Sequence, residues 1–380
     1  KMAVPLKKMG YEIHYLLIRD KDKTGITKEG IHFEVLKVKT FSKNKYLNFI
    51  LKNLEINNNY KKLFNKAKNL NADIYHFHDL WINKIGVKLK NLKQNPVVFY
   101  DAREPYAEDY LSYTKATGWL KKGVELFAKF VDQWEKKKAK HYDLVISNEE
   151  IVCNNFRSAI GEGKAEVLYN FTDNYHLFEN RAIHQKKFDF IYSGGITELR
   201  GALKILEATN IAKQQNQQIK VVFVGKYSPE KLKNEMQVYI DTHDLNDNIE
   251  LHSHVNYSEI SSYYNNSKIG LVTLFNCPTF KISMPIKIFE YMAFGLPILG
   301  SDFGPIKKYI ETENCGLLVN PENPLEISNA MCKLLTDLDL YHLYSENGRS
   351  ATLKKYKWDF ELDKLVSYYQ KALIERESIN

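Results

Sequence analysis

Residues 280–297 read FKISMPIKIFEYMAFGLP, and this stretch decides how the second half of the chain is interpreted. Proline is favoured in the first turn of a helix, so Pro285 predicts a helix that begins there, with Ser283 as its cap. Gly295 ends this helix, and Pro297 starts the next strand. A short helix followed at once by an apolar strand is typical of an α/β fold.

The helix predicted in this stretch carries two charged side chains, Lys287 and Glu290, about one turn apart. The unpaired backbone N–H groups at a helix N-terminus bind anions, and Lys287 adds positive charge at the same place. The carboxylate of Glu290 can accept two hydrogen bonds from a vicinal diol such as that of a ribose. The segment therefore predicts a cradle for a diphosphate and a sugar, which a purely structural helix would not need.

Strands and helices alternate on both sides of this stretch. In the second half, strands are predicted at 188–192, 220–225, 249–252, 269–275, 297–300 and 316–319, and helices at 201–214, 229–243, 257–265, 285–294 and 305–311. In the first half, strands are predicted at 11–18, 31–38, 74–78, 97–100 and 144–147, and helices at 47–70, 84–92 and 118–140. This order indicates parallel sheets covered by helices.

The polar stretch 169–187 interrupts the alternation and is interpreted as an interdomain connection. The predicted fold class is α/β, with two tandem Rossmann-like, doubly wound domains and a cleft between them, where a ligand is expected near the carboxyl ends of the strands. The predicted domains are residues 1–172, completed by a C-terminal helix over 356–380, and residues 185–355. Because residues 1–10 resemble the end of a helix, we expect a first strand to be missing from the chain.

The composition is that of a globular protein, with 380 residues, of which 44% are hydrophobic and 26% are charged. The apolar runs are far shorter than the roughly 18–20 residues of a membrane-spanning helix, and no signal peptide is visible, which favours a cytoplasmic location. The four cysteines have no metal-ligand spacing, so we expect reduced, buried thiols. No GxxxxGK[ST] loop is present, which argues against a P-loop nucleotidase.

Positive charge is concentrated in the first half of the chain. Residues 1–180 hold 31 Lys and Arg against 22 Asp and Glu, whereas residues 181–380 hold 23 against 24. A one-sided basic field indicates an anionic partner, such as a membrane surface or a phosphorylated substrate. Nucleic acid is set aside because no nucleic-acid-binding motif accompanies the charge.

A second phosphate-binding feature follows the strand predicted at 188–192. Gly194 and Gly195 would let a phosphate approach the backbone, and Arg200 lies at the start of the next helix. A cation is unfavourable at a helix N-terminus, so Arg200 is better explained if an anionic ligand lies beside it. The alternative is a solvated surface arginine.

The pattern Pro-x-Lys-x-Phe-Glu-Tyr-Met-Ala-x-Gly-x-Pro at 285–297 resembles the donor-binding motif of family 4 glycosyltransferases with the GT-B fold. The resemblance extends over most of the chain. It includes Tyr-Ser-Gly-Gly at 192–195, Arg-Gly at 200–201, Val-Val-Phe-Val-Gly at 221–225, Tyr-His-Phe-His-Asp at 75–79 and Tyr-Asp-Ala-Arg-Glu at 100–104.

The resemblance implies transfer of a sugar, with retention, from a nucleotide diphosphate sugar, and without a metal or other cofactor. It assigns catalysis to Glu290, which would bind the ribose, and to Arg200 and Lys287, which would neutralise the leaving diphosphate. It assigns donor contacts to Gly194, Gly195, Val255, Ser283, Met284, Pro285 and Ile286. It places the acceptor near His78, Asp79, Arg103 and Glu104.

The chain departs from the family pattern at three positions. Ile282 stands where the family often has a glutamate, Gly195 where it has an arginine, and Arg103 where many members have a histidine. Arginine stays protonated, so Arg103 cannot act as a base, but it could hold an acceptor phosphate or carboxylate.

The function predicted from the sequence is transfer from a nucleotide diphosphate sugar, expected to be a UDP-sugar, to a glycan or lipid-linked glycan in cell-surface polysaccharide or glycoconjugate synthesis. Two alternatives stay open: a non-catalytic subunit that binds a nucleotide sugar, and an epimerase of the same fold. The protein is expected in the cytoplasm or at the inner face of the cell membrane.

Two further segments allow more than one interpretation. The basic amphipathic helix at 118–140 either packs only on its own sheet or lies on an anionic leaflet, with Trp119 and Trp134 at the interface. His76 and His78 share one face of a strand and, with Asp79, suggest a metal site, although a role in packing or near the acceptor is favoured. His252 and His254 have the same spacing and are interpreted as mainly structural.

Overall fold

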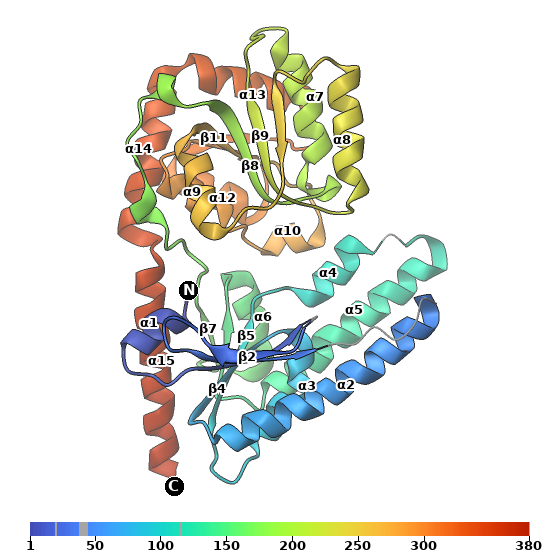
Figure 1. The fold of residues 1–380 in the computed structure, drawn as a ribbon, viewed down its shortest axis with the longest axis vertical. Helices are drawn as coiled ribbons and strands as arrows, with labels where there is room; N and C mark the ends of the chain where they lie inside the picture. The colour runs from blue at the N-terminus through green and yellow to red at the C-terminus, as the bar shows by residue number, and fades with distance from the viewer. Residues whose placement is uncertain (20, 38–44, 115, 380) are drawn as a thin grey trace. The chain divides into compact units, whose positions relative to one another are not determined.

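The computed structural model describes residues 1–19, 21–37, 45–114 and 116–379, and it divides into two units (Figure 1). Unit 1 contains Lys1–Tyr169 and Leu362–Asn380, and unit 2 contains Asn170–Glu361. The ends of two predicted elements, Val38 and Asn380, lie outside the described residues.

Unit 1 contains two sheets among the described residues. The first has the order β1-β3-β2, and the second has the order β4-β5-β6-β7 with all neighbouring strands parallel. Their bounds are β1 His14–Arg19, β2 Lys23–Ile26, β3 His32–Lys37, β4 Ile74–His78, β5 Val97–Ala102, β6 Leu144–Ser147 and β7 Ala165–Val167. All six residues of β5 are buried, as expected for a central parallel strand.

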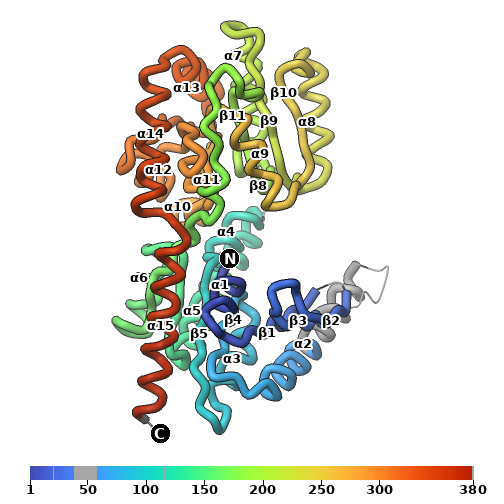
Figure 2. The backbone as a smooth tube through the Cα atoms, turned by 60° about the vertical axis from the view of Figure 1, so that its left-hand side comes forward, coloured from blue at the N-terminus to red at the C-terminus, as the bar shows by residue number. Residues whose placement is uncertain are grey.

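The helices of unit 1 connect and cover these strands. They are α1 Ala3–Lys8, α2 Lys45–Leu70, α3 Asn83–Lys90, α4 Tyr106–Tyr113, α5 Gly118–Ala139 and α6 Glu150–Ile160, with the short 3₁₀ turn η1 Leu80–Ile82. The last helix, α15 Trp358–Ile379, runs beside strands β4 and β5 (Figure 2). There the ring of Tyr369 lies 5.1 Å from the ring of Phe99.

The alternation of elements did not predict the antiparallel pairing of β2 with β3. Gly30 adopts φ +77°, and the N–H of Thr27 donates to the carbonyl of Ile31, which closes a tight turn between the two strands. All four residues of β2 are exposed, so the strand has no apolar run that would reveal it in the sequence. Helices α4 and α6 and strand β7 were also not predicted.

Unit 2 contains one sheet of six parallel strands in the order β10-β9-β8-β11-β12-β13. The strands are β8 Phe188–Ile196, β9 Val221–Tyr227, β10 Ile249–His252, β11 Ser267–Val272, β12 Ile298–Ser301 and β13 Gly316–Val319. The helices are α7 Ala202–Lys213, α8 Lys231–Thr242, α9 Tyr257–Asn265, α10 Pro278–Ile282, α11 Lys287–Ala293, α12 Gly304–Glu313, α13 Pro324–Thr336 and α14 Leu338–Lys355. The 3₁₀ turns are η2 Tyr175–Leu177, η3 Ile183–Gln185 and η4 Glu198–Arg200.

Helices cover both faces of this sheet. On one face, residues of α7, α8 and α13 form a buried cluster with strand residues such as Phe190 and Phe223. On the other face, the Tyr291 hydroxyl of α11 donates to the carbonyl of Ile191, and its ring fills the space over Gly270. The predicted doubly wound arrangement is therefore confirmed for unit 2.

The region around residues 278–287 differs from the prediction. Residues 278–282 form the separate helix α10, and the Ser283 hydroxyl donates to the carbonyl of Thr279, 2.8 Å away. The prediction that Ser283 caps the following helix is wrong, because its side chain bonds back to α10. Helix α11 begins at Lys287 rather than at Pro285.

Among the described residues, no helix combines the length and the apolar character that crossing a bilayer would require. The four cysteines are free thiols; Cys332 is partly exposed and the other three are buried.

Candidate functional site

The carboxyl ends of β8 and β9 come together at a pair of glycines. A Cβ on Gly225 would lie 1.7 Å from the carbonyl oxygen of Gly194, so only glycine allows this approach. Gly194 itself adopts φ +101°, a conformation that favours glycine. A Cβ on Gly194 would lie 3.7 Å from the Nζ atom of Lys287. The glycine turn thus lies directly beside the ammonium of Lys287.

Lys287 is buried in the first turn of α11, with 5% of its surface exposed. Its Nζ atom lies 3.8 Å from the centroid of the Tyr192 ring and has no hydrogen-bond partner among the described residues. Burial lowers the pKa of Lys287 well below its ordinary value of 10.5; nearby Arg200 lowers it further, and Glu290 opposes this. A buried ammonium without a hydrogen bond is unfavourable, so an anion at this place would be bound strongly.

Arg200 places a second positive charge beside the same turn. The next residue, Gly201, has φ +76°, and a Cβ there would lie 2.2 Å from the carbonyl oxygen of Thr273. The guanidinium of Arg200 lies 3.8 Å from the position of a Cβ on Gly195 and 5.5 Å from the centroid of the Phe280 ring. Lys287 thus lies beside Gly194 and Arg200 beside Gly195 of the same turn.

Buried polar atoms without a partner also gather at this edge of the sheet. Seven such side-chain atoms occur among the described residues, and four of them belong to Lys287, Thr197, Tyr227 and Thr273. The last three follow or end strands β8, β9 and β11. Buried polar groups are normally satisfied, so this concentration indicates a place for a polar ligand.

Glu290 is held by a buried network of hydroxyl groups. Tyr264 donates to Oε2 of Glu290 over 2.8 Å, and the Tyr264 hydroxyl lies 3.0 Å from the Ser193 hydroxyl. The backbone N–H of Ser193 donates to the Tyr291 hydroxyl over 3.0 Å. Burial, together with the charge of Glu290, raises the pKa of Tyr264 well above 10, so its hydroxyl stays protonated and donates. The carboxylate therefore has a fixed orientation.

Several residues of this network were not predicted. Tyr291 and Ser193 occur in the quoted motifs, but their sequence neighbours do not reveal the contact between them. Tyr264 lies 26 residues before Glu290 in the amphipathic helix α9, and nothing in its local pattern singles it out.

The remaining predicted donor contacts lie in two loops of unit 2. Ser283, Met284, Pro285 and Ile286 form the half-buried connection between α10 and α11. Val255 lies in the loop after β10, the edge strand that β9 separates from β8.

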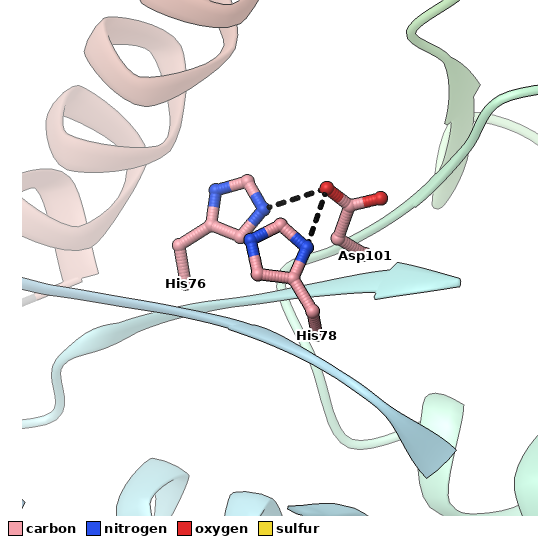
Figure 3. A group of neighbouring side chains, drawn as sticks. All are labelled: His76, His78 and Asp101. Carbon is pink, nitrogen blue, oxygen red and sulfur yellow. Dashed lines mark hydrogen bonds and ion pairs between the residues drawn. The ribbon is translucent and has the colours of Figure 1, made fainter. Parts of the chain in front are cut away.

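Two of the predicted acceptor residues, His78 and Arg103, contact the buried Asp101 near the end of β5. A single oxygen of Asp101, Oδ2, lies 2.9 Å from Nδ1 of His78 and 3.3 Å from Nε2 of His76 (Figure 3). The same oxygen lies 2.9 Å from Nε of Arg103. Burial alone would raise the pKa of Asp101, but the hydrogen bonds from the two histidines and the charge of Arg103 hold it well below 3.8. Burial also lowers the pKa of His76.

His76, His78 and Asp101 each offer one ligand atom, and the three atoms lie within 4.8 Å of one another. Such a group could hold a metal ion, but the guanidinium of Arg103 already bonds the carboxylate oxygen that would serve as a ligand. The interpretation that included Asp79 is wrong, because its carboxylate accepts from the N–H of Trp81 and caps η1.

The exposed part of this cluster consists of His78 and Arg103, whose side chains are 44% and 28% exposed. The side chain of Glu104, which follows Arg103, is also exposed. In unit 2, His252 lies 2.8 Å from Glu250 and 2.9 Å from the Tyr263 hydroxyl, which agrees with the expected structural role.

Residues 174–351, which make up most of unit 2, match the model of one protein family. That family is Glycosyl transferases group 1. The glycine turn, Arg200, Lys287 and Glu290 all lie inside the range that matches the group 1 glycosyl transferases.

The chain is also similar to a relative and to solved structures over most of its length. It is 22% identical over 339 residues to the uncharacterized glycosyltransferase MJ1607 of Methanocaldococcus jannaschii, covering 79% of this chain and 76% of that protein. Sucrose-phosphate synthase from Thermosynechococcus elongatus has a TM-score of 0.75 at 15% identity, covering 98% of this chain and 92% of that one. Anabaena Alr3699/HepE in complex with UDP has a TM-score of 0.70 at 14% identity, covering 95% of this chain and 100% of that one.

These likenesses establish the fold. The chain has the α/β GT-B fold with parallel sheets, consistent with two Rossmann-like domains, as the sequence predicted.

Proposed function

We propose that this chain transfers a sugar, with retention, from a UDP-sugar to a glycan or lipid-linked glycan in the synthesis of a cell-surface polysaccharide or glycoconjugate. The observation that carries the proposal is the buried ammonium of Lys287, which has no hydrogen-bond partner among the described residues and lies beside the glycine turn. The group 1 glycosyl transferase match covers this turn.

The diphosphate of the donor would lie at the ends of β8 and β9. There the backbone of Gly194 and Gly195 permits close approach, and Lys287 and Arg200 would bond the phosphate oxygens. As the bond between the sugar and the diphosphate breaks, negative charge develops on the leaving phosphate. The two cations would stabilise this charge, the role that a divalent ion has in other transferases, so we expect no metal requirement.

Glu290 would bind the ribose of the nucleotide. Tyr264 fixes the orientation of the carboxylate through one oxygen, which prepares it to accept hydrogen bonds from the ribose hydroxyls. The backbone near Ser283 and Met284 would contact the donor sugar, and the backbone near Val255 would contact the base. The choice of uridine is supported by the complex of the similar Anabaena protein with UDP.

The acceptor would bind near His78, Asp79, Arg103 and Glu104 of unit 1. Arg103 and His78 are the exposed donors of the Asp101 cluster, and their contacts with Asp101 orient them. They would bind a phosphate or carboxylate group of the acceptor. A lipid-linked acceptor would require the protein to work at the inner face of the cell membrane.

Thermal unfolding with UDP, GDP, ADP and their sugars tests the donor assignment. A ligand at about 100 times its dissociation constant stabilises the folded state by about 2.7 kcal/mol. We expect UDP and one UDP-sugar to stabilise the wild type and to do so less in Glu290→Ala, while Glu235→Ala, an exposed residue of α8, responds like the wild type. No response of the wild type to any nucleotide or sugar nucleotide would refute the proposal.

Product analysis separates transfer from the two alternatives. We expect the UDP-sugar to stay intact without an acceptor and to lose its sugar when the matching acceptor is added. An isomerised donor would indicate an epimerase. Binding without turnover over a wide acceptor panel would favour a non-catalytic subunit.

A further inference from the structure

Helix α5 buries only a narrow part of its surface. Of its 22 residues, the buried ones are Ala128, Val131, Glu135 and Ala139. This agrees in part with the expectation that the helix packs on its own sheet. The buried part holds no aromatic side chain, so the aromatic residues of α5 lie elsewhere.

A second apolar face of α5 is exposed. Trp119 is 79% exposed, Leu126 is 70% exposed and Phe130 is 58% exposed. At about 100° per residue, these three positions fall within about 40° of one another on the helix. Leu120 and Phe127 are also exposed and lie next to them. Five large apolar residues on one helix face form an extended patch rather than isolated exposures.

Helix α4 continues this patch. The ring centroids of Tyr110 and Phe127 lie 4.9 Å apart, and α4 and α5 lie side by side in unit 1 (Figure 1). Leu111 and Tyr113 of α4 are exposed as well. The name α4–α5 surface is used for the exposed residues Trp119, Leu120, Leu126, Phe127 and Phe130 of α5 together with Tyr110 of α4, whose ring contacts Phe127.

Lysines border the α4–α5 surface on one side. Lys122, Lys129 and Lys136 fall within about 40° of one another and about 80° from the stripe of Trp119, Leu126 and Phe130. Lys122 and Lys129 are exposed, and Lys136 pairs with Asp132. Helix α5 holds six lysines against three acidic residues, one of them the buried Glu135. The helix is therefore apolar on one exposed side and basic on the next.

The exposed stripe leads into a cavity of about 390 Å³ between α5 and the η1–α3 segment. Phe130, Val131 and Trp134 line it from α5, and Trp81 faces Trp134 with ring centroids 5.9 Å apart. Two more lining residues, Lys84 and Lys138, have their ammonium groups 5.1 Å and 6.0 Å from the rings of Trp81 and Trp134. The cavity thus combines apolar walls with two amines, which suits a lipid with an anionic headgroup.

We propose that the α4–α5 surface docks on a membrane that contains anionic phospholipids. In this arrangement Trp119, Leu126 and Phe130 enter the interfacial region, the lysines face the phosphates, and the Trp81–Trp134 cavity receives part of one lipid. The proposal goes beyond the sugar transfer and depends on none of the donor-site residues. A bilayer is favoured over a protein partner because lysines outnumber acidic residues six to three on α5, and tryptophan is enriched at membrane interfaces.

Flotation with lipid vesicles tests the proposal on the full chain. We expect binding to vesicles of phosphatidylcholine with phosphatidylglycerol, much weaker binding to phosphatidylcholine alone, and release by salt. A lysine near an anionic surface strengthens binding about 5-fold. Lys122→Ala with Lys129→Ala should therefore weaken binding about 30-fold, and Leu126→Asp with Phe130→Asp should abolish it.

Two controls keep the result interpretable. Val238→Asp, at a residue of α8 that is 64% exposed, should bind vesicles like the wild type. Circular dichroism should show that every variant is folded. UDP should stabilise all of the variants equally, which would show that a loss of membrane binding does not come from a damaged donor site. Wild-type binding that ignores lipid charge and salt, or unchanged binding of Leu126→Asp with Phe130→Asp, would overturn the proposal. A wild type that forms dimers but does not bind vesicles, with dimers that are lost in Leu126→Asp with Phe130→Asp, would also overturn the proposal and would assign the surface to self-association.

Discussion

Replacing Lys287 by methionine is expected to stabilise the chain and to weaken its binding of UDP. The ammonium of Lys287 is buried and has no hydrogen-bond partner among the described residues. Methionine is unbranched and flexible, so it can occupy the same space without a charge. If Lys287 served only for packing, its replacement would not raise the stability of the fold while weakening the binding of UDP.

The magnitude follows from the surroundings of Lys287. An unsatisfied buried charge costs about 3 kcal/mol, and the contact with the Tyr192 ring offsets about 1 kcal/mol of this. The expected net gain of about 2 kcal/mol raises the Tm by about 4–8 °C for a unit of this size. Loss of hydrogen bonds from the ammonium to a diphosphate, worth about 1.5–3 kcal/mol, raises the Kd for UDP about 10- to 100-fold.

The stabilisation should depend on pH in a defined direction. The folded-state pKa of Lys287 lies below its ordinary value of 10.5, so the penalty for burying the charge is complete below the folded pKa. It disappears as the pH rises toward 10.5. The advantage of Lys287→Met over the wild type should therefore shrink with rising pH.

Differential scanning calorimetry with and without UDP, over a range of pH, measures both effects. Lys333→Met, at an exposed lysine of α13, is the matched control and should change neither Tm nor UDP affinity appreciably. A lower Tm of ligand-free Lys287→Met, or an unchanged Kd for UDP, would show that the reasoning about this ammonium is wrong.

Two further predictions concern the ends of the central strands. Gly225→Ala should destabilise unit 2 by about 3 kcal/mol, because its Cβ would lie 1.7 Å from the carbonyl oxygen of Gly194. Urea unfolding measures this loss. The control is Gly123→Ala, whose Cβ meets nothing within 4 Å and which should be neutral or stabilising. Asp101→Asn should destabilise unit 1 at neutral pH. The folded state lowers the pKa of Asp101, so its ionised carboxylate stabilises the fold above about pH 4, and this stabilisation is lost as the pH falls. The Asn variant lacks the carboxylate and should therefore lose less stability than the wild type on acidification. Equal acid sensitivity of the Asn variant and the wild type in unfolding experiments would contradict the role assigned to Asp101.

Local patterns were sufficient to predict most of the elements of unit 2. The apolar runs of β10 and β13 and the spacing of α9 give the observed bounds, because each pattern is contained in a few consecutive residues. Strand β2 and helix α10 lack such a pattern. The four residues of β2 are all exposed, and α10 is a short helix that begins with Pro278.

The candidate site was only partly predictable for the same reason. Lys287 and Glu290 could be selected because both occur in one motif, but the burial of Lys287 depends on Tyr192, far away in the sequence. Asp101 was not selected, although its neighbours His78 and Arg103 were. Its importance arises only when β4 and β5 pair and bring His76 and His78 to one carboxylate oxygen.

The position of Tyr369 in unit 1 has a consequence for the order in which the protein forms during synthesis. Its hydroxyl bonds Nδ1 of His76, 293 residues earlier, and Leu362–Asn380 count with Lys1–Tyr169 as one unit. At a translation rate of about 5–20 residues per second, roughly 15–60 s pass between the emergence of these two partners. All of Asn170–Glu361 leaves the ribosome within that interval. Translation of unit 1 therefore begins first and is completed last. Unit 2 can fold before the final helix of unit 1 has been synthesised.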